Sequence, residues 1–267
     1  QNSKSEKDFG FRASDFGFSS SEFTLNLIDT PGHADFSYEV SRSLAAVEGA
    51  ILLVDATQGV QAQTLANLYL AQQEGLTIIP VVNKIDLPSA TKEKTIEELS
   101  ALVGCSPNDV YAISAKEGTG VKPLIAAVIE KIPPPVAKFK YLNIEIFKSA
   151  DNAPLRALVF DSKYDPYLGV IAHVRVMDGA LQRGDRIYFM ATETGAEVLE
   201  VGIFAPARSP GESLQKGEIG YVATGIKEPE RVRVGDTITH AAIFKHLNIE
   251  TARMFSLPGY REVAPVV

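Results

Sequence analysis

The sequence is poor in cysteine, in long apolar runs and in basic charge. Its 267 residues include one cysteine, Cys105, which cannot form an internal disulfide and fits a reducing, intracellular setting. No apolar run reaches the roughly 18 residues that a membrane-spanning helix needs, and residues 1–20 lack the core of a signal peptide. Lys and Arg total 26 against 33 Asp and Glu, which disfavours a dominant basic surface for nucleic acid but leaves a local patch open.

The first half of the chain alternates between strand and helix patterns. Apolar runs predict buried strands over 50–54, 77–82 and 110–113, each covered on both faces. Helical spacing of apolar residues predicts helices over 35–48, 61–74, 92–103 and 120–132. This alternation predicts an α/β domain with a mostly parallel sheet, closed by the stiff proline run at 133–135.

The pattern changes from about residue 155 onwards. Short strands separated by turns are predicted over 155–160, 170–177, 186–190, 197–204, 217–224 and 236–239. Regularly spaced strands without intervening helices indicate a small antiparallel barrel. With 45% apolar residues over 267 positions, the chain can bury two cores of ordinary size.

The stretch Leu25–Phe36, LNLIDTPGHADF, carries the first candidate site. Apolar residues alternate over 23–27 and predict a strand that the following Pro and Gly end, which places Asp29 at its carboxyl end. A carboxylate there can hold Mg²⁺ through water, and the Gly32 N–H can approach a phosphate because no side chain intervenes. His33 then lies beside that phosphate. The alternatives are an ordinary loop and, for His33, a solvated residue near a helix N-terminus.

The strand over 77–82 is followed by Asn83-Lys84-Ile85-Asp86. A guanine base presents two adjacent donors, and the Asp86 carboxylate can accept both, whereas adenine would leave it unpaired. Asn83 can use its amide on the acceptor edge of the purine, and the alkyl stem of Lys84 can cover one face of the base. The alternative is a solvated loop after a strand.

The next strand ends at Ser114-Ala115-Lys116. The Ala115 N–H could meet the guanine O6, while Ser114 supports the loop and the Lys116 stem covers the other face of the base. This tripeptide means little alone. Three strands that end in DTPGH, NKID and SAK, in that order, make a guanine-nucleotide site the leading interpretation.

The same motifs occur in translational GTPases and closely resemble the LepA (elongation factor 4) family. The resemblance rests on DTPGHADFSYEVSRSLAAVEGA, IIPVVNKIDLPSA and, in the second region, FDSKYDPYLGV and GEIGYVATGIKEPERVRVGDTIT. It covers most of residues 23–136 and 153–240, together with 257–267. The stretches 137–152 and 241–256 match the family poorly.

The resemblance implies an α/β G domain, with helices on both faces of a mostly parallel sheet, followed by an all-β translation-factor barrel. The implied divisions are an N-terminally incomplete GTP-binding domain over 1–136, a linker over 137–152, the barrel over 153–240, and a linker with the start of a further domain over 241–267. By the same match, Asp29 lies in the Mg²⁺ shell, Gly32 contacts the γ-phosphate and His33 orients the attacking water.

The implied activity is hydrolysis of GTP to GDP and phosphate, with Mg²⁺, stimulated by the ribosome. The implied partners are the large-subunit RNA with its associated proteins and tRNA-bound ribosomal complexes. The implied setting is the bacterial cytoplasm, for a monomer without a transmembrane segment. Peripheral association with the inner membrane and an organellar source remain open.

The sequence departs from the family at the phosphate-binding loop. It contains no GxxxxGK[ST] motif and no Gly-Lys pair at all, and the switch segment that supplies a second Mg²⁺ ligand is missing as well. The chain starts at Gln1 rather than Met, so we expect an internal piece of a longer GTPase that is inactive by itself. The alternatives are a nucleotide-independent module with a degenerate G domain that binds the ribosome or RNA, and another member of the class such as a translocase or a stress-protection factor.

Overall fold

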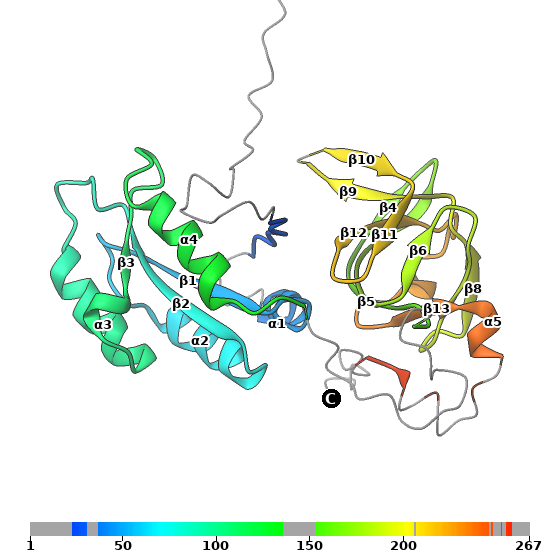
Figure 1. Ribbon diagram of the computed structural model, residues 1–267, viewed down its shortest axis with the longest axis horizontal. Coiled ribbons are helices and arrows are strands. Elements are labelled where there is room, and N and C mark those ends of the chain that lie inside the picture. Colours follow the sequence, from blue (N-terminus) through cyan, green and yellow to red (C-terminus); the bar gives the residue numbers. More distant parts are fainter. Residues whose placement is uncertain are drawn as a thin grey trace, which may run out of the picture. The chain divides into compact units, whose positions relative to one another are not determined.

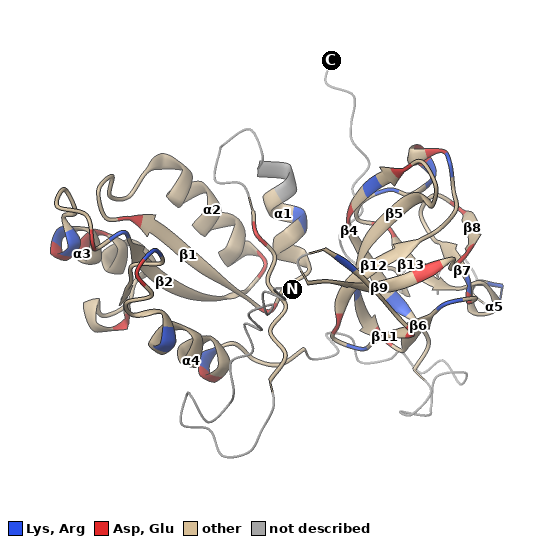
Figure 2. Ribbon diagram, turned by 90° about the horizontal axis from the view of Figure 1, so that it is seen from above, with Lys and Arg blue, Asp and Glu red and all other residues tan. Residues whose placement is uncertain are grey.

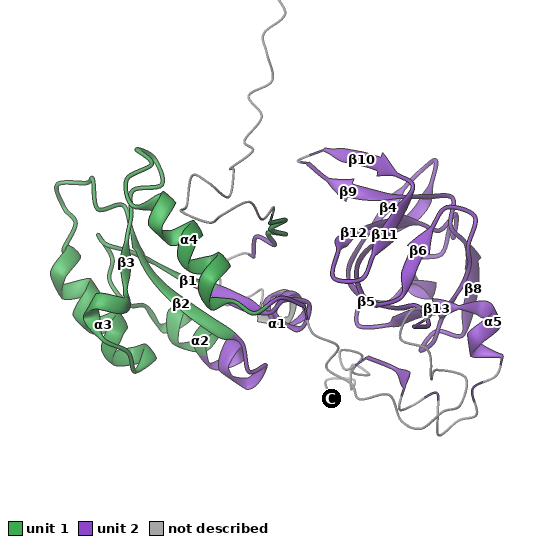
Figure 3. Ribbon diagram, viewed as in Figure 1, with its two compact units in different colours: residues 1–27, 51–68, 77–133 green, residues 28–50, 69–76, 134–267 purple. Residues whose placement is uncertain are grey.

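The computed structural model describes residues 23–30, 37–135, 153–205, 207–245, 247, 252 and 255–257. The described residues separate into two compact units, drawn in green and purple in Figure 3. The first unit takes its residues from 1–27, 51–68 and 77–133, and the second from 28–50, 69–76 and 134–267. Basic and acidic residues appear interspersed in both units (Figure 2).

Strands and helices alternate in the first half of the chain, as predicted (Figure 1). The elements that follow one another are β1 (Gly49–Asp55), α2 (Ala62–Gln73), β2 (Thr77–Asn83), α3 (Lys92–Val103), β3 (Tyr111–Ala112) and α4 (Val121–Lys131). The strands form one sheet in the order β1-β2-β3. β2 and β3 run parallel, with Val81 opposite Tyr111 and Val82 opposite Ala112.

The central strand β2 is covered on both faces, as predicted. Val82 packs in a cluster with Leu99 of α3, whereas Ile79 and Val81 pack with Leu124 of α4. These three β2 side chains are at most 1% exposed. Successive strand residues point to opposite faces, so an unbroken apolar run is what a strand between two helices requires.

The same prediction is wrong for β1. Ile51 and Leu53 are 37% and 54% exposed, while Val54 on the opposite face is buried against the α3 side of the sheet. β1 lies at the end of the described three-stranded sheet, and the cluster around Leu124 of α4 is built on β2 and the residues near β3 instead. One face of β1 therefore keeps apolar side chains in contact with water.

The predicted strand over 23–27 is also wrong. Residues 23–30 have no regular secondary structure, and the described sheets do not include them. Phe23, Leu25 and Leu27 are 45%, 49% and 86% exposed. Alternation of apolar residues favours a strand only where one face is buried and a neighbouring strand pairs with it, and the described part of this stretch lies at the surface instead.

Ten antiparallel strands form the all-β part of the second unit, as the predicted barrel requires. They are β4 (Arg156–Asp165), β5 (Gly169–Asp178), β6 (Ala180–Gln182), β7 (Arg186–Phe189), β8 (Thr194–Glu197), β9 (Glu200–Phe204), β10 (Arg208–Gly211), β11 (Ser213–Gln215), β12 (Ile219–Ala223) and β13 (Thr237–His240). Eight of them follow the order β10-β9-β12-β5-β4-β13-β7-β8, and β11 pairs with β6. A short helix, α5 (Ala241–Phe244), follows β13.

The core of this all-β part is made of inward-facing aliphatic residues and one phenylalanine. Leu155, Val174, Leu181, Ile187, Phe189, Leu214 and Ile238 belong to one cluster and are fully buried. A buried ion pair lies beside it, in which Arg156 donates from Nε and Nη2 to Asp178 Oδ2 at 3.0 and 2.5 Å. The neighbouring strands β4 and β5 are held together by this pair in addition to their backbone hydrogen bonds.

Helix α1 (Ser37–Ala45) belongs to the second unit and is anchored to its strands. The buried Arg175 of β5 donates from Nη1 to the Ala46 carbonyl at 2.6 Å and pairs with Glu48. Ala46 also packs in a cluster with Leu158 of β4 and with Leu257. Burial lowers the pKa of Arg175 to about 10, so the guanidinium remains charged at neutral pH.

Candidate functional site

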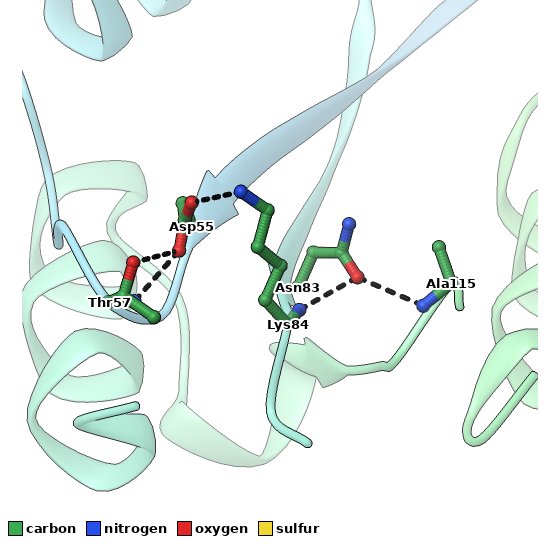
Figure 4. Close-up of polar contacts among 5 residues, drawn as sticks. All are labelled: Asp55, Thr57, Asn83, Lys84 and Ala115. Carbon is green, nitrogen blue, oxygen red and sulfur yellow. Dashed lines mark hydrogen bonds and ion pairs between the residues drawn. The ribbon is translucent and has the colours of Figure 1, made fainter. Parts of the chain in front are cut away.

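Three loops meet at the carboxyl ends of β1, β2 and β3. They carry Asp55 and Thr57, Asn83 and Lys84, and Ala115, and Figure 4 shows the contacts among these residues. Parallel strands place their carboxyl ends at one edge of a sheet, which is where open α/β sheets bind ligands. The sequence motifs NKID and SAK are therefore brought together in one unit, as we expected.

Asn83 joins the second loop to the third. Its Oδ1 accepts hydrogen bonds from the backbone N–H groups of Lys84, at 2.8 Å, and Ala115, at 3.0 Å (Figure 4). The Asn83 amide nitrogen remains the part of this side chain that can donate to a purine acceptor. Because Asn83 already uses the Ala115 N–H, a bond from that group to a guanine oxygen would have to be shared or exchanged.

Lys84 joins the second loop to the first. Its φ is 63°, in the left-handed region that few residues other than glycine adopt, and its Nζ lies 2.6 Å from Asp55 Oδ2. Asp55 Oδ1 accepts from the backbone N–H and the hydroxyl of Thr57, at 2.8 and 2.7 Å. Burial opposes ionisation of Asp55, but the Lys84 ammonium and the Thr57 donors together outweigh it, so the pKa of this carboxyl lies below its ordinary value.

Ser114 braces the third loop from inside. It is 1% exposed, and its hydroxyl accepts from the Glu117 N–H at 3.2 Å, while its N–H donates to the Thr119 carbonyl at 2.9 Å. Gly120 closes the loop at φ 73°, where a Cβ atom would lie 2.4 Å from the Ala112 carbonyl oxygen. A glycine is therefore required at this position for both its conformation and the space that it leaves.

A hollow of about 280 Å³ opens among these loops. Its lining residues are Asn83, Lys84, Asp86, Leu87 and Lys116. They provide one carboxylate, one amide and two long alkyl stems, which are the groups expected around a guanine base. A volume near 300 Å³ is at the lower end for small-molecule sites, so the hollow suits a base rather than a whole nucleotide.

Of the predicted phosphate-binding and metal-binding residues, the structure describes only Asp29. Asp29 is exposed in the irregular stretch 23–30 and belongs to the second unit, while Gly32 and His33 lie outside the described residues. Within the described ranges, no group of three or more His, Cys, Asp or Glu side chains is placed to hold a metal ion. The lining residues of the hollow fit a purine base, and for Mg²⁺ the role of the exposed Asp29 carboxylate stays a prediction.

A larger hollow, of about 490 Å³, lies in the all-β part of the second unit. It is lined by Ala191, Thr192, Glu193, Thr194, Glu230, Arg231 and Arg233. None of these residues belongs to the motifs that the sequence singled out, and opposite charges are mixed around its rim. The volume of this hollow does not by itself indicate a ligand.

Asp55 and Thr57 are the residues that sequence reasoning missed. The predicted strand over 50–54 stops one residue before Asp55, and an acidic residue at the carboxyl end of a strand was a usable signal. The ion pair joins positions 29 residues apart, and their proximity follows from the sheet order rather than from any local pattern. Among the described residues, no helix is long and apolar enough to cross a membrane.

Two family models match the chain. Residues 2–134 match the elongation factor Tu GTP binding domain, and residues 169–239 match elongation factor Tu domain 2. These matches agree with the described elements, an α/β region with a parallel sheet followed by an antiparallel all-β region. The expected fold class, a G domain followed by a translation-factor barrel, is confirmed.

Curated relatives extend the likeness along nearly the whole chain. Elongation factor 4 of Thermobifida fusca is 53% identical over 245 residues, which are 92% of this chain and 37% of that protein. Elongation factor 4 of Thermotoga maritima is 52% identical over 92% of this chain and 36% of its own length, and that of Rubrobacter xylanophilus is 51% identical over 92% and 37%. The chain spans just over a third of the length of these relatives. With both family models and these relatives in agreement, the chain belongs to the elongation factor 4 (LepA) family.

Proposed function

We propose that this chain supplies the guanine-reading part of a translational GTPase of elongation factor 4 type, which hydrolyses GTP to GDP and phosphate on the ribosome. The observation that carries the proposal is the Asn83 bridge between the NKID and SAK loops, beside a hollow lined by Asp86. The family membership supports a GTPase of translation. The ribosome, its large-subunit RNA and tRNA-bound ribosomal complexes are the proposed partners, and the proposed setting is the bacterial cytoplasm.

Each residue of the base site has a distinct task in this proposal. Asp86 accepts the two adjacent donors of guanine, Asn83 donates to the acceptor edge, and the stems of Lys84 and Lys116 cover the faces of the ring. Ser114 and Ala115 set the position of the third loop. An adenine base would leave the Asp86 carboxylate unpaired, and such a loss costs about 1–3 kcal/mol.

Catalysis is assigned to the DTPGH segment. In the proposal, Asp29 would be one of the residues that hold Mg²⁺, the Gly32 N–H would contact the γ-phosphate, and His33 would orient the attacking water. When bound, Mg²⁺ neutralises charge on the phosphates. Phosphoryl transfer depends on positioning more than on a strong base, so an imidazole suits this role.

Exchange of Asp86 tests the base-reading assignment. Asp86→Asn should shift preference from guanine towards xanthine nucleotides, because the 2-oxo group of xanthine suits an amide donor. Competition binding of GDP and xanthosine diphosphate to a longer protein that joins this chain to a Gly-rich phosphate loop measures the shift, with Asp109→Asn as a control that removes a carboxylate at another exposed position. An unchanged preference for guanine would contradict the assignment.

The role of His33 is testable in a longer protein that joins this chain to a Gly-rich phosphate loop. His33→Ala should abolish ribosome-stimulated phosphate release and leave GDP binding intact. Normal stimulated turnover in this variant would show that His33 is not the water-positioning residue.

A nucleotide-independent module that binds the ribosome or RNA is the second candidate. It is favoured by the absence of a Gly-Lys pair from the sequence and of a metal-binding cluster from the described residues. Most nucleotide binding energy comes through the phosphates, so we expect weak or undetectable binding of GDP to these 267 residues by calorimetry. Submicromolar binding would rule out this second candidate and show that the missing loop is not needed.

A further inference from the structure

Both ends of the Lys84 side chain are held in place, and Asp55 holds the outer one. At the backbone end, φ is 63° and the N–H donates to Asn83 Oδ1 at 2.8 Å. At the other end, Nζ lies 2.6 Å from Asp55 Oδ2. A lysine has four rotatable side-chain bonds and is normally among the most mobile residues at a surface, so this double anchoring is an unusual restraint.

Asp55 is itself held in place by its own loop. Its second oxygen, Oδ1, accepts from Thr57 twice, and the next residue, Ala56, donates its N–H to the Asn83 carbonyl at 2.9 Å. The Ala56 carbonyl accepts from the N–H and the hydroxyl of Thr91, at 2.8 and 3.1 Å. The two carboxylate oxygens of Asp55 therefore accept from different donors, Oδ1 from the loop after β1 and Oδ2 from Lys84.

The anchored stem of Lys84 lies at the hollow. Lys84 lines it together with Lys116, Asp86 and Leu87, and its side chain is 52% exposed, while that of Asp55 is 18% exposed. Asp55 is not among the lining residues of this hollow. An effect of Asp55 on a bound base would therefore pass through Lys84.

We propose that Asp55 is a positioning residue of the guanine site, which holds the Lys84 stem in place to cover one face of the base. The inference rests on the proposed function. A stem that is already ordered loses less freedom when a base binds, and this preorganisation strengthens binding. Covering a ring face does not distinguish one purine from another, so Asp55 affects affinity and leaves the choice of base to Asp86 and the other groups at the edges of the base.

Titration of the ¹⁵N-labelled 267-residue chain with nucleoside monophosphates tests the inference. The probes are GMP and IMP, which differ in the 2-amino group that Asp86 reads, with AMP as the non-cognate base. The amides of Lys84 and Ala115 report binding, and the remaining amides of β2 and β3 report whether each variant is folded. We expect millimolar affinity, with GMP preferred over IMP and AMP.

Asp55→Asn should weaken GMP and IMP binding by the same factor, about 3- to 10-fold, because one side chain is released from a fixed position. The ratio of GMP to IMP affinity should stay as in the unaltered chain. Asp55→Glu, which keeps the carboxylate, should recover most of the loss. Asp109→Asn removes a similar carboxylate, 3.9 Å from Lys131, and should change nothing.

A double-variant comparison separates positioning from a general structural effect. Lys84→Met keeps an apolar stem and removes the ammonium, so Asp55→Asn should cost nothing further in that background. A purely structural role would give additive losses and would disturb the GMP to IMP ratio. Either of these results would overturn the inference.

The base preference of the site and the role of Asp55 can be tested separately with the same titrations. If the unaltered chain does not prefer GMP to AMP, the proposed function fails and the inference fails with it. If the unaltered chain prefers GMP to AMP, and Asp55→Asn binds GMP and IMP as tightly as the unaltered chain does, only the role of Asp55 is wrong.

Discussion

Asp55 and Asp178 each pair with a cation through Oδ2, but the surroundings of the two pairs differ. Asp55 lies at the edge of the α/β unit beside Lys84, whose side chain is 52% exposed. Asp178 and Arg156 lie inside the all-β unit, where their side chains are 1% and 4% exposed. Water can replace Lys84 beside Asp55, whereas Arg156 beside Asp178 is almost entirely shielded from water.

The difference separates a contact that holds the fold from a contact that restricts a side chain at the surface. Removing one partner of a buried ion pair leaves the other charge buried without its counter-charge, so the stability of the fold depends on such a pair. An exposed pair contributes little to stability and can still restrict a mobile side chain. Three substitutions test this contrast, from the largest expected effect on stability to the smallest.

Asp178→Ala should lower the free energy of unfolding more than the other two substitutions. Removal of the buried carboxylate takes away the counter-charge that Asp178 gives the buried Arg156 guanidinium, which we expect to lower the free energy of unfolding by about 3–5 kcal/mol. Hydrogen exchange of β4 and β5 amides measures the loss. Lys216→Ala is the matched control, because Lys216 contacts Asp178 Oδ1 at 3.5 Å from an exposed position and should contribute less than about 1 kcal/mol. Equal effects of the two substitutions would contradict the contrast.

Arg175→Met should have an intermediate effect. The methionine keeps much of the apolar stem but leaves the buried Ala46 carbonyl and Glu48 without their donor, at a cost of about 1–3 kcal/mol. Urea unfolding followed by circular dichroism measures it. Arg208→Met serves as the control, since Arg208 is 37% exposed and lies 3.4 Å from Asp165. Unchanged stability in Arg175→Met would mean that α1 is not anchored through this side chain.

Asp55→Asn should have the smallest effect on stability, below about 1 kcal/mol, because the pair with Lys84 is open to water. The folded-state pKa of Asp55 lies below its ordinary value, so its contribution is present above that ordinary value and is lost as the pH falls through the folded pKa. The difference between Asp55→Asn and the unaltered chain should therefore be constant from neutral pH down to about pH 5 and disappear in stronger acid. If the stability difference between Asp55→Asn and the unaltered chain grew as the pH fell, the folded-state pKa of Asp55 would not lie below its ordinary value.

The local sequence was sufficient where one element decides the outcome. The unbroken apolar run over Ile78–Val82 predicted a strand covered on both faces, and the structure confirms it. The four helices of the first half were likewise predicted to within a few residues from their apolar spacing. In each case, the pattern that predicts the element lies within the element itself.

The sequence was insufficient where the outcome depends on a distant neighbour. Ile51 and Leu53 have the composition of a buried strand, and only the sheet order shows that β1 ends the described sheet. The strands β6, β8, β10 and β11 have three or four residues each, too few for an alternating pattern to separate them from turns. The pairing of Asp55 with Lys84 similarly depends on which strand ends lie next to each other.

The anchoring of α1 by Arg175 also has a consequence for the order in which the chain folds during synthesis. The contact between Arg175 and the Ala46 carbonyl joins residues 129 positions apart. A ribosome adds about 5–20 residues per second, so α1 is made several seconds before β5 can cover it. During that interval the segment that ends in Ala46 has no partner strand, and we expect its final packing to wait until β4 and β5 have paired.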